Sequence, residues 1–190
     1  MGIEIERKFL VKDIPKNYGE NISIPIEQAY LNVSPAIRVR RQGEQFFLTY
    51  KGGRGEELVA DGDTGFGSPF GTGGIGQSEY NLPLDEETYR HLLEKADGVI
   101  IRKTRYLLPL NEDAYDPAYL EENAGLKARV ATGTIKIELD LFKTPRKGLM
   151  IAEVEFPSED AARNYRPASW FGDEVTNDKN YSNAHLSVDG

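Results

Sequence analysis

Near the start of this chain, three charged residues stand at strict two-residue spacing between the apolar residues Ile3, Ile5 and Phe9. The charged members of the run are Glu4, Glu6 and Lys8. On a β-strand this spacing places the three charged side chains on one face and the apolar ones on the other. Two carboxylates and a lysine on one face can hold a divalent cation and contact an anionic oxygen beside it. The alternative is a helical turn, in which Glu4 and Lys8 form a solvent-exposed i,i+4 ion pair.

The same alternation returns wherever the sequence reads as strand, and this repetition favours the strand. The repeats lie at residues 37–40, 49–51, 101–106, 135–141 and 151–156. An ordinary half-exposed sheet explains any one of these strands. It explains the whole set less well, because the charged faces mix acids with bases and contain few Ser, Thr or Gln. A closed antiparallel barrel gives these faces a common interior, where charges persist only if they are paired, hydrated or neutralised by a ligand and a metal.

In these residues and in their order, the chain resembles the CYTH domain proteins, also called triphosphate tunnel metalloenzymes, and their bacterial branch in particular. The family hallmark, Glu-x-Glu-x-Lys on the first strand, corresponds to Glu4, Glu6 and Lys8. Later matches lie at residues 28–31, 38–40, 48–51, 79, 103–105, 138–140, 153–155, 170–176 and 181–183. The resemblance implies a mostly β (α+β) fold, a closed eight-stranded antiparallel barrel with a few flanking helices. It covers nearly the whole chain, so residues 1–190 are expected to form a single domain.

Composition agrees with one domain and excludes several kinds of site. A chain of 190 residues with 39% hydrophobic content can bury one sizeable core. Cysteine is absent, so a disulfide framework and a thiolate zinc site are excluded. The two histidines, His91 and His185, have no second ligand type clustered with them and are interpreted as structural. No segment approaches the roughly 20 apolar residues that cross a bilayer, and no signal-peptide run is present, so we expect a cytoplasmic protein without a membrane partner.

The charge distribution favours a small polyanion as the partner. The chain has 23 Lys and Arg against 31 Asp and Glu, and its net charge of −8 would repel a nucleic-acid backbone. The bases nevertheless gather on the strand faces assigned to the interior, at Arg38, Arg40, Lys51, Lys103 and Arg105. Such a distribution favours an anion that enters the protein over a duplex on its surface. We therefore expect a small polyanion and no nucleic acid, and the resemblance implies that this anion is a small-molecule triphosphate.

The resemblance and the needs of a triphosphate together assign roles to these residues. Binding such a polyanion requires several cations, with arginine giving bidentate contacts and lysine a point charge. The expected substrate-binding residues are Lys8, Arg38, Arg40, Lys51, Lys103 and Arg105. Mg²⁺ or Mn²⁺ held by carboxylates can bridge phosphate oxygens and activate water. The expected metal ligands are Glu4, Glu6, Glu153 and Glu155, with Glu79, Glu138 and Asp140 as second choices. The expected catalytic residues are Glu4, Glu6, Lys8 and Tyr30, the last of which would face the phosphates.

The resulting hypothesis is a metal-dependent triphosphatase, with inorganic tripolyphosphate as the favoured substrate because of the similarity to the bacterial branch. Thiamine triphosphatase, nucleoside triphosphatase, class IV-type adenylate cyclase and RNA 5′-triphosphatase activities are alternatives. A tunnel that binds polyphosphate or nucleotides without hydrolysing them is another. For Glu138 and Arg105, a purely structural ion-pair network is an alternative to a role in binding. A homodimer is compatible with the resemblance.

Two segments depart from the family pattern. Residues 52–76 are crowded with glycine but lack the spacing of a P-loop, and they are interpreted as a flexible loop at the barrel rim. Residues 111–133 are interpreted as an elaborated, exposed hairpin connection with a helix-prone stretch at 118–128. Asn81 stands where family members often carry a second acid, so this strand is expected to contribute Glu79 alone.

Two further helices are predicted from their ends. Asp85 reads as the N-cap of a helix with an apolar stripe up to residue 96, and Gly98 reads as its C-cap. Ser158 precedes a second helix start, which Pro167 is expected to end.

Overall fold

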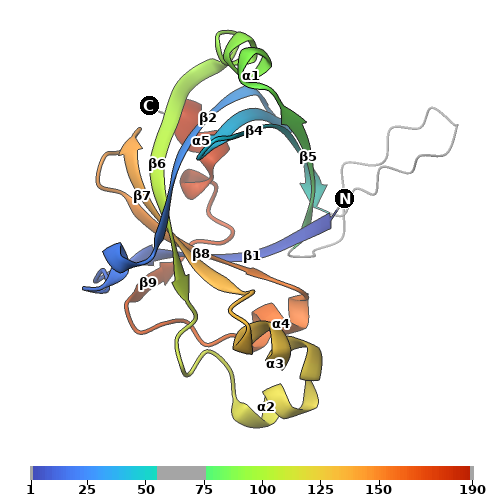
Figure 1. The fold of residues 1–190 in the computed structure, drawn as a ribbon, viewed down its shortest axis with the longest axis vertical. Coiled ribbons are helices and arrows are strands. Elements are labelled where there is room, and N and C mark those ends of the chain that lie inside the picture. The colour runs from blue at the N-terminus through green and yellow to red at the C-terminus, as the bar shows by residue number, and fades with distance from the viewer. Residues whose placement is uncertain (1, 55–75, 189–190) are drawn as a thin grey trace, which may run out of the picture.

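The computed structural model describes residues 2–54 and 76–188 (Figure 1). Its strands are β1 (Gly2–Val11), β2 (Ile22–Val33), β3 (Ala36–Gln42), β4 (Gln45–Arg54), β5 (Gly76–Leu84), β6 (Asp97–Pro109), β7 (Lys136–Thr144), β8 (Met150–Phe156) and β9 (Phe171–Glu174). Its helices are α1 (Glu86–Leu93), α2 (Pro117–Glu122), α3 (Ala124–Ala131), α4 (Glu159–Asn164) and α5 (Asn183–Val188), with 3₁₀ turns η1 (Tyr18–Glu20) and η2 (Lys179–Tyr181). The predicted glycine-rich loop lies largely outside the described residues.

The strands form one curved antiparallel sheet that bends round into a ring, whose interior we call the tunnel (Figure 1). Their order is β5-β4-β3-β2-β6-β7-β8-β1-β9, and β1 also pairs with β5, from Gly2 opposite Glu79 to Ile5 opposite Gly76. This join covers only the ends of two strands, while β9 pairs farther along β1. The predicted mostly β fold is therefore confirmed. The described residues form nine strands where eight were predicted, and "closed barrel" describes their curved sheet only approximately.

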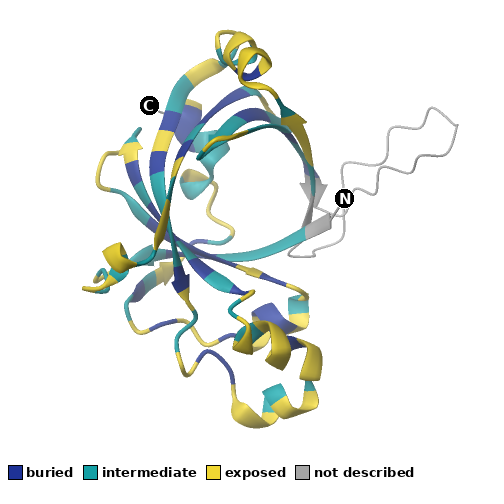
Figure 2. Ribbon diagram, in the orientation of Figure 1, coloured by how far each residue is buried: buried dark blue, intermediate teal, exposed yellow. Residues whose placement is uncertain are grey.

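The two-residue alternation separates a charged interior from an apolar exterior. Phe9, Leu139, Val154 and Phe156 are each at most 4% exposed and belong to the largest apolar cluster. They lie on the outer face of β1, β7 and β8, where α3 and α4 cover the sheet (Figure 2). The main hydrophobic core thus lies outside the tunnel. Because most of the apolar surface that is buried on folding lies on the outer face, the inner face can carry charged side chains.

The connection at 111–133 is helical, as predicted, but it is not simply exposed. It forms α2 and α3, and Ala114, Tyr115 and Leu126 are only 2%, 3% and 8% exposed. All three belong to the apolar cluster on the outside of the sheet. The prediction of an exposed connection holds for most of these residues, but it missed the three that cover the apolar outer face of β1, β7 and β8.

The ends of two helices test the predicted caps. Asp85 caps α1 by accepting a hydrogen bond from the Thr88 amide at 2.7 Å, and Ser158 caps α4 in the same way. Gly98 is not the C-cap of α1, because α1 ends at Leu93 and Gly98 lies in β6 with φ of +74°. A Cβ there would lie 2.2 Å from the carbonyl oxygen of Ser187, so this glycine permits the close approach of α5. The helix α4 ends at Asn164, ahead of Pro167.

The C-terminal segment covers one part of the tunnel interior. Figure 1 shows α5 within the ring of strands, and it packs against β6 and β2. Leu186 of α5 is fully buried in a cluster with Tyr30, Ile101, Phe142 and Ile151. No helix in the described part of the chain is long and apolar enough to span a bilayer.

Candidate functional site

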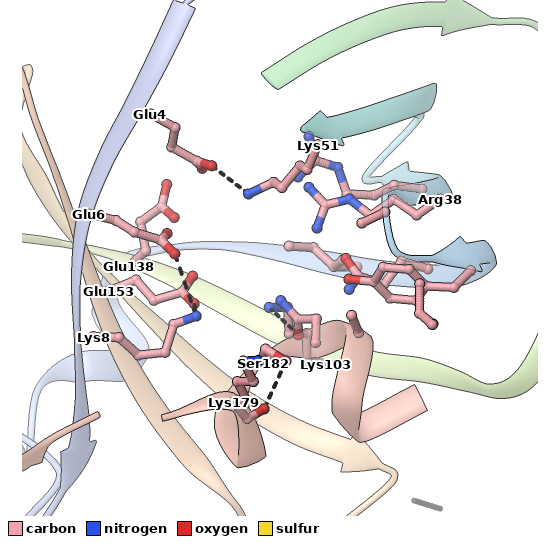
Figure 3. A pocket seen from close by; sticks show the side chains of 18 of the residues that line it. Glu4, Glu6, Lys8, Arg38, Lys51, Lys103, Glu138, Glu153, Lys179 and Ser182 are labelled. Carbon is pink, nitrogen blue, oxygen red and sulfur yellow. Dashed lines mark hydrogen bonds and ion pairs between the residues drawn. The ribbon is translucent and has the colours of Figure 1, made fainter. Parts of the chain in front are cut away.

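The charged interior surrounds a cavity of about 610 Å³ (Figure 3). The predicted site residues that line it are Glu4, Glu6, Lys8, Tyr30, Arg38, Arg40, Lys51, Lys103, Arg105, Glu138, Glu153 and Glu155. Glu79 and Asp140 do not line the cavity but form ion pairs with residues that do. The structure therefore brings together side chains from seven strands that are far apart in the sequence.

Strand register decides which of these side chains face each other. Across β1 and β8, Glu6 lies opposite Glu155 and Lys8 lies opposite Glu153. We use the name carboxylate wall for eight inward side chains of β1, β6, β7 and β8, which are Glu6, Lys8, Lys103, Arg105, Glu138, Asp140, Glu153 and Glu155; Glu4 belongs to a third group described below. We call the inward side chains of β2 and β3 the donor wall; they are Gln28, Tyr30, Arg38 and Arg40. Figure 3 shows Glu6, Lys8, Glu138 and Glu153 on one side of the cavity and Arg38 on the other.

Every lysine and arginine of the carboxylate wall already has a carboxylate partner. Lys8 Nζ lies 2.9 Å from Glu153 Oε1, and Lys103 Nζ lies 2.5 Å from Asp140 Oδ2. Arg105 contacts three carboxylates, with Asp140 at 2.7 Å, Glu153 at 2.6 Å and Glu138 as the third. These are charge-assisted contacts between buried groups, so each side chain is held in place by several neighbours.

The pairing shifts the pKa values within this wall. Burial raises the pKa of Glu153, but the charges of Lys8, Lys103 and Arg105 outweigh it and hold this pKa well below its usual range. Burial lowers the pKa of Lys103, although Asp140 opposes the effect. Burial also raises the pKa of Glu138, against the opposing charge of Arg105. Glu153, the carboxylate with these three cationic neighbours, is therefore firmly ionised.

A third group links the two walls across β4, β5 and β1. Lys51 forms ion pairs with Glu4 and with Glu79, the latter at 2.8 Å, and Arg38 lies 3.8 Å from Glu79. Burial raises the pKa of Glu4 to about 7 despite Lys51. For Glu79, burial acts in the same direction, but Lys51 and Arg38 outweigh it and lower the pKa to about 2. The two carboxylates that share Lys51 therefore differ sharply in how readily they take up a proton.

Asn81 shows what replaces the expected second acid on β5. Its side-chain amide donates to Glu79 Oε1 at 2.7 Å, and its carbonyl accepts a hydrogen bond from the Thr49 hydroxyl at 2.7 Å. The residue orients Glu79 and adds no charge. Glu79 itself pairs with Lys51 and Arg38.

The donor wall has unused hydrogen-bonding capacity. Nε of Arg38, Nε of Arg40 and Nε2 of Gln28 are buried and have no acceptor among the residues that the structure describes. Arg38 is 5% exposed, and burial together with the charge of Arg38 lowers the pKa of Arg40 to about 10. Buried donors without acceptors are unfavourable unless a guest supplies one. This wall is therefore suited to an anion.

The carboxylates fit a divalent cation that is shared with a guest. Glu6 and Glu155 lie directly opposite each other, and burial, followed by the charges of Glu79 and Glu6, raises the pKa of Glu155. Like charges in opposite positions are unfavourable without a cation between them. Among the described residues, no three His, Asp or Glu side chains form a ready-made metal cage. Mg²⁺ commonly uses one or two carboxylates, water and substrate phosphates, which matches this arrangement.

Eleven of the lining residues were not among the predicted site residues. Besides Ser34 in the turn between β2 and β3, the polar ones are Gln28, Lys179, Ser182 and Asn183. The position of Gln28, two residues before Tyr30 on one strand, was a signal that could have identified it. The other three come from the C-terminal segment, where no charge alternation indicates an inward face. Asn183 Oδ1 lies 3.5 Å from Lys103 Nζ, so this segment contacts the carboxylate wall directly.

Comparison with known proteins agrees with this architecture. The inorganic triphosphatase of Nitrosomonas europaea is 33% identical over 188 residues, covering 97% of both chains. The inorganic triphosphatase of Acetivibrio thermocellus is 28% identical over 189 residues, covering 98% of this chain and 94% of that protein. The crystal structure of the inorganic triphosphatase NE1496 has a TM-score of 0.59 and 31% identity, covering 99% of this chain and 96% of that one. Residues 2–174 match the CYTH domain, and this chain belongs to that family.

Proposed function

We propose that this protein hydrolyses inorganic tripolyphosphate in its tunnel with the help of Mg²⁺ or Mn²⁺. The observation that carries the proposal is the meeting of the carboxylate wall and the donor wall around one cavity of about 610 Å³. One wall offers carboxylates for a cation, and the other offers buried donors for an anion. Two relatives of nearly the same length are inorganic triphosphatases, which supports this substrate over other polyanions.

The donor wall would bind the phosphate chain. Arg38 and Arg40 present guanidinium groups suited to phosphate oxygens, and Lys51 lies beside them on β4. Tyr30 lies opposite Arg38 on β2 and also lines the cavity. These side chains lie on adjacent strands, so their spacing is set by the sheet. The substrate would thus be aligned by residues that need little rearrangement.

The carboxylate wall would act on the phosphate that is removed. Glu6 and Glu155 are our first choice as metal ligands because they face each other across β1 and β8, with Glu4 on the same strand face. A bound Mg²⁺ or Mn²⁺ would neutralise phosphate charge and lower the pKa of a coordinated water. Lys8, held by Glu153, would donate to a phosphate oxygen on which negative charge develops.

The test is phosphate release by purified protein from tripolyphosphate, ATP and thiamine triphosphate, each with Mg²⁺, with Mn²⁺ and with EDTA. We expect the highest kcat/KM for tripolyphosphate and no release in EDTA. Glu6→Gln and Glu155→Gln should each lower kcat by at least about 100-fold, because each removes a charge from the cation site. Glu44→Gln is the matched control, since Glu44 lies exposed between β3 and β4, beside Arg41.

The same assay distinguishes the alternatives. Tight binding of tripolyphosphate without release in either metal would refute hydrolysis and indicate a binding module. A cyclic nucleotide formed from ATP would indicate a cyclase. Faster release from 5′-triphosphate RNA than from tripolyphosphate would indicate an RNA triphosphatase. Full activity in EDTA, or in both carboxylate variants, would contradict the metal site.

A further inference from the structure

The donor wall contains a buried amide group that the proposed chemistry does not yet use. Gln28 is 1% exposed, lines the cavity, and has no acceptor for Nε2 among the described residues. It is a neutral side chain in the middle of a strongly charged interior. A buried amide N–H without a partner is unfavourable, so its presence needs an explanation.

The neighbouring strands explain why the protein itself offers Gln28 no acceptor. On β3, the residue opposite Gln28 is Arg40, whose guanidinium carries only donors. On β6, the opposite residue is Ile101, which is apolar and fully buried. The two residues that pair with Gln28 across the sheet therefore offer its amide no side-chain acceptor.

The free donors are confined to one side of the cavity. Nε of Arg38 and Nε of Arg40 also lack acceptors, and both lie on the strand paired with that of Gln28. In the carboxylate wall, by contrast, Lys8, Lys103 and Arg105 all have carboxylate partners. An anionic oxygen entering the tunnel would find unsatisfied donors only at the β2–β3 pair among these residues.

We infer that Gln28 and Arg40 form a binding subsite for a phosphate group of the substrate that does not contact the metal. This inference rests on the proposed function and extends it to a residue with no assigned role. The Arg40 guanidinium supplies positive charge for the phosphate. The Gln28 amide N–H fixes where the phosphate oxygen lies, because an uncharged donor binds well only at short distance and good alignment. The tripolyphosphate chain would then extend from this subsite toward Glu6 and Glu155.

The subsite predicts a contribution to binding that does not require metal. The test is the Kd of tripolyphosphate measured calorimetrically with EDTA and again with Ca²⁺, for the wild type and variants. Gln28→Leu keeps the approximate volume and removes the donor, and it should weaken binding about 10- to 100-fold in both conditions. Gln28→Glu places acceptors where the anion lies and should weaken binding further.

Two matched variants define what the result means. Gln42→Leu is the control, because Gln42 lies two residues beyond Arg40 on β3 and does not line the cavity; its Kd should remain within about twofold of the wild type. Glu155→Gln should lose the gain that Ca²⁺ provides but bind no more weakly than the wild type in EDTA. Under turnover conditions, Gln28→Leu should raise KM more than it lowers kcat, because the contact is present in substrate and transition state alike.

The urea midpoint is measured for each variant so that unfolding is not mistaken for lost binding. Gln28→Glu can pair with Arg40, so it provides a folded variant if Gln28→Leu does not fold. An unchanged Kd in a folded Gln28 variant would overturn the subsite while leaving hydrolysis intact. A wild type that neither binds nor hydrolyses tripolyphosphate would overturn both the subsite and the proposed function.

Discussion

The two walls of the tunnel contain similar residues in opposite states. In the carboxylate wall, Arg105 contacts three carboxylates and Lys103 is paired with a fully buried aspartate. In the donor wall, Arg40 has no ion pair with a described carboxylate, and its Nε has no acceptor. The lysines and the arginine of the first wall are matched by carboxylates of the protein, whereas Arg40 of the second wall gains a partner only when a guest enters.

This difference separates stability from binding. A cation whose charge is already matched contributes to holding the sheet together, whereas an unmatched buried cation weakens the fold and gains a partner when an anion enters. Substitutions in the two walls should therefore have different signatures. Losses in the carboxylate wall should appear in unfolding experiments, and losses in the donor wall should appear in affinity.

Asp140 offers the strongest test of the satisfied wall. It is 0% exposed and lies between Lys103 and Arg105, so Asp140→Leu leaves two buried cations short of a partner. We expect a loss of about 3–5 kcal/mol in the free energy of unfolding, measured by urea titration. Glu121→Leu, which removes a surface ion pair with Lys127, should cost less than about 1 kcal/mol. Equal small losses in both variants would remove the distinction between the walls.

Lys8 tests whether a satisfied cation also takes part in chemistry. In Lys8→Met, Glu153 still has Arg105 as a partner. The ion pairs around Arg105 therefore remain, and only the pairs that Lys8 forms with Glu153 and Glu6 are lost. We expect kcat to fall about 100- to 1,000-fold, as when a donor to developing charge is removed. Lys12→Met, just beyond the end of β1, is the control. A folded Lys8→Met protein with wild-type kcat would assign Lys8 a structural role alone.

Glu79 makes the link between the walls sensitive to acid. Its pKa is about 2 in the folded protein and about 4.5 when unperturbed, so the unfolded chain takes up the proton first as pH falls. Stability from this group is fully present above pH 4.5 and is lost progressively toward pH 2, by up to about 3 kcal/mol. Urea midpoints between pH 5 and pH 3 should fall less steeply in Glu79→Gln than in the wild type.

The control for this pH dependence is Glu87→Gln, on the exposed first turn of α1. Its midpoints should follow those of the wild type across the same range. Parallel curves for the wild type and Glu79→Gln would show that Lys51 and Arg38 do not hold the Glu79 carboxylate in its ionised form.

Arg40 provides the test of the unsatisfied wall. Arg40→Met should raise the KM for tripolyphosphate about 10- to 50-fold, because a charged contact to phosphate is lost. Its urea midpoint should stay the same or rise, since a partly buried charge without a carboxylate partner among the described residues is removed. Arg41→Met is the matched control, because Arg41 pairs with Glu44 in an exposed position at 3.0 Å. Destabilisation without a change in KM would place Arg40 with the satisfied residues.

Some features of this protein follow from chain geometry alone. Residues two apart on a strand share a face, so Glu4, Glu6 and Lys8 had to point the same way once β1 was a strand. The same rule placed Arg38 with Arg40 and Glu153 with Glu155. Local chemistry was equally sufficient at Asp85 and Ser158, which cap their helices through side-chain oxygens.

Other features depend on which segments meet. Gly98 resembles a helix C-cap in the sequence, but its lack of a side chain serves a contact with Ser187, which is far away along the chain. Tyr115 and Leu126 lie in a stretch that looks exposed until the outer face of the sheet is seen to need covering. Local pattern carries no information about such partners.

The sequence by itself determined which side chains share a strand face and therefore that the interior would be charged. Only the tertiary structure decided which of these charges are matched. Asp140 and Glu155 both looked like candidate metal ligands, yet Asp140 is held between two cations and Glu155 lies opposite Glu6 on the neighbouring strand. The physical reason is that pairing depends on cross-strand register and on distances of a few ångströms between distant segments, and neither is encoded in the spacing along one strand.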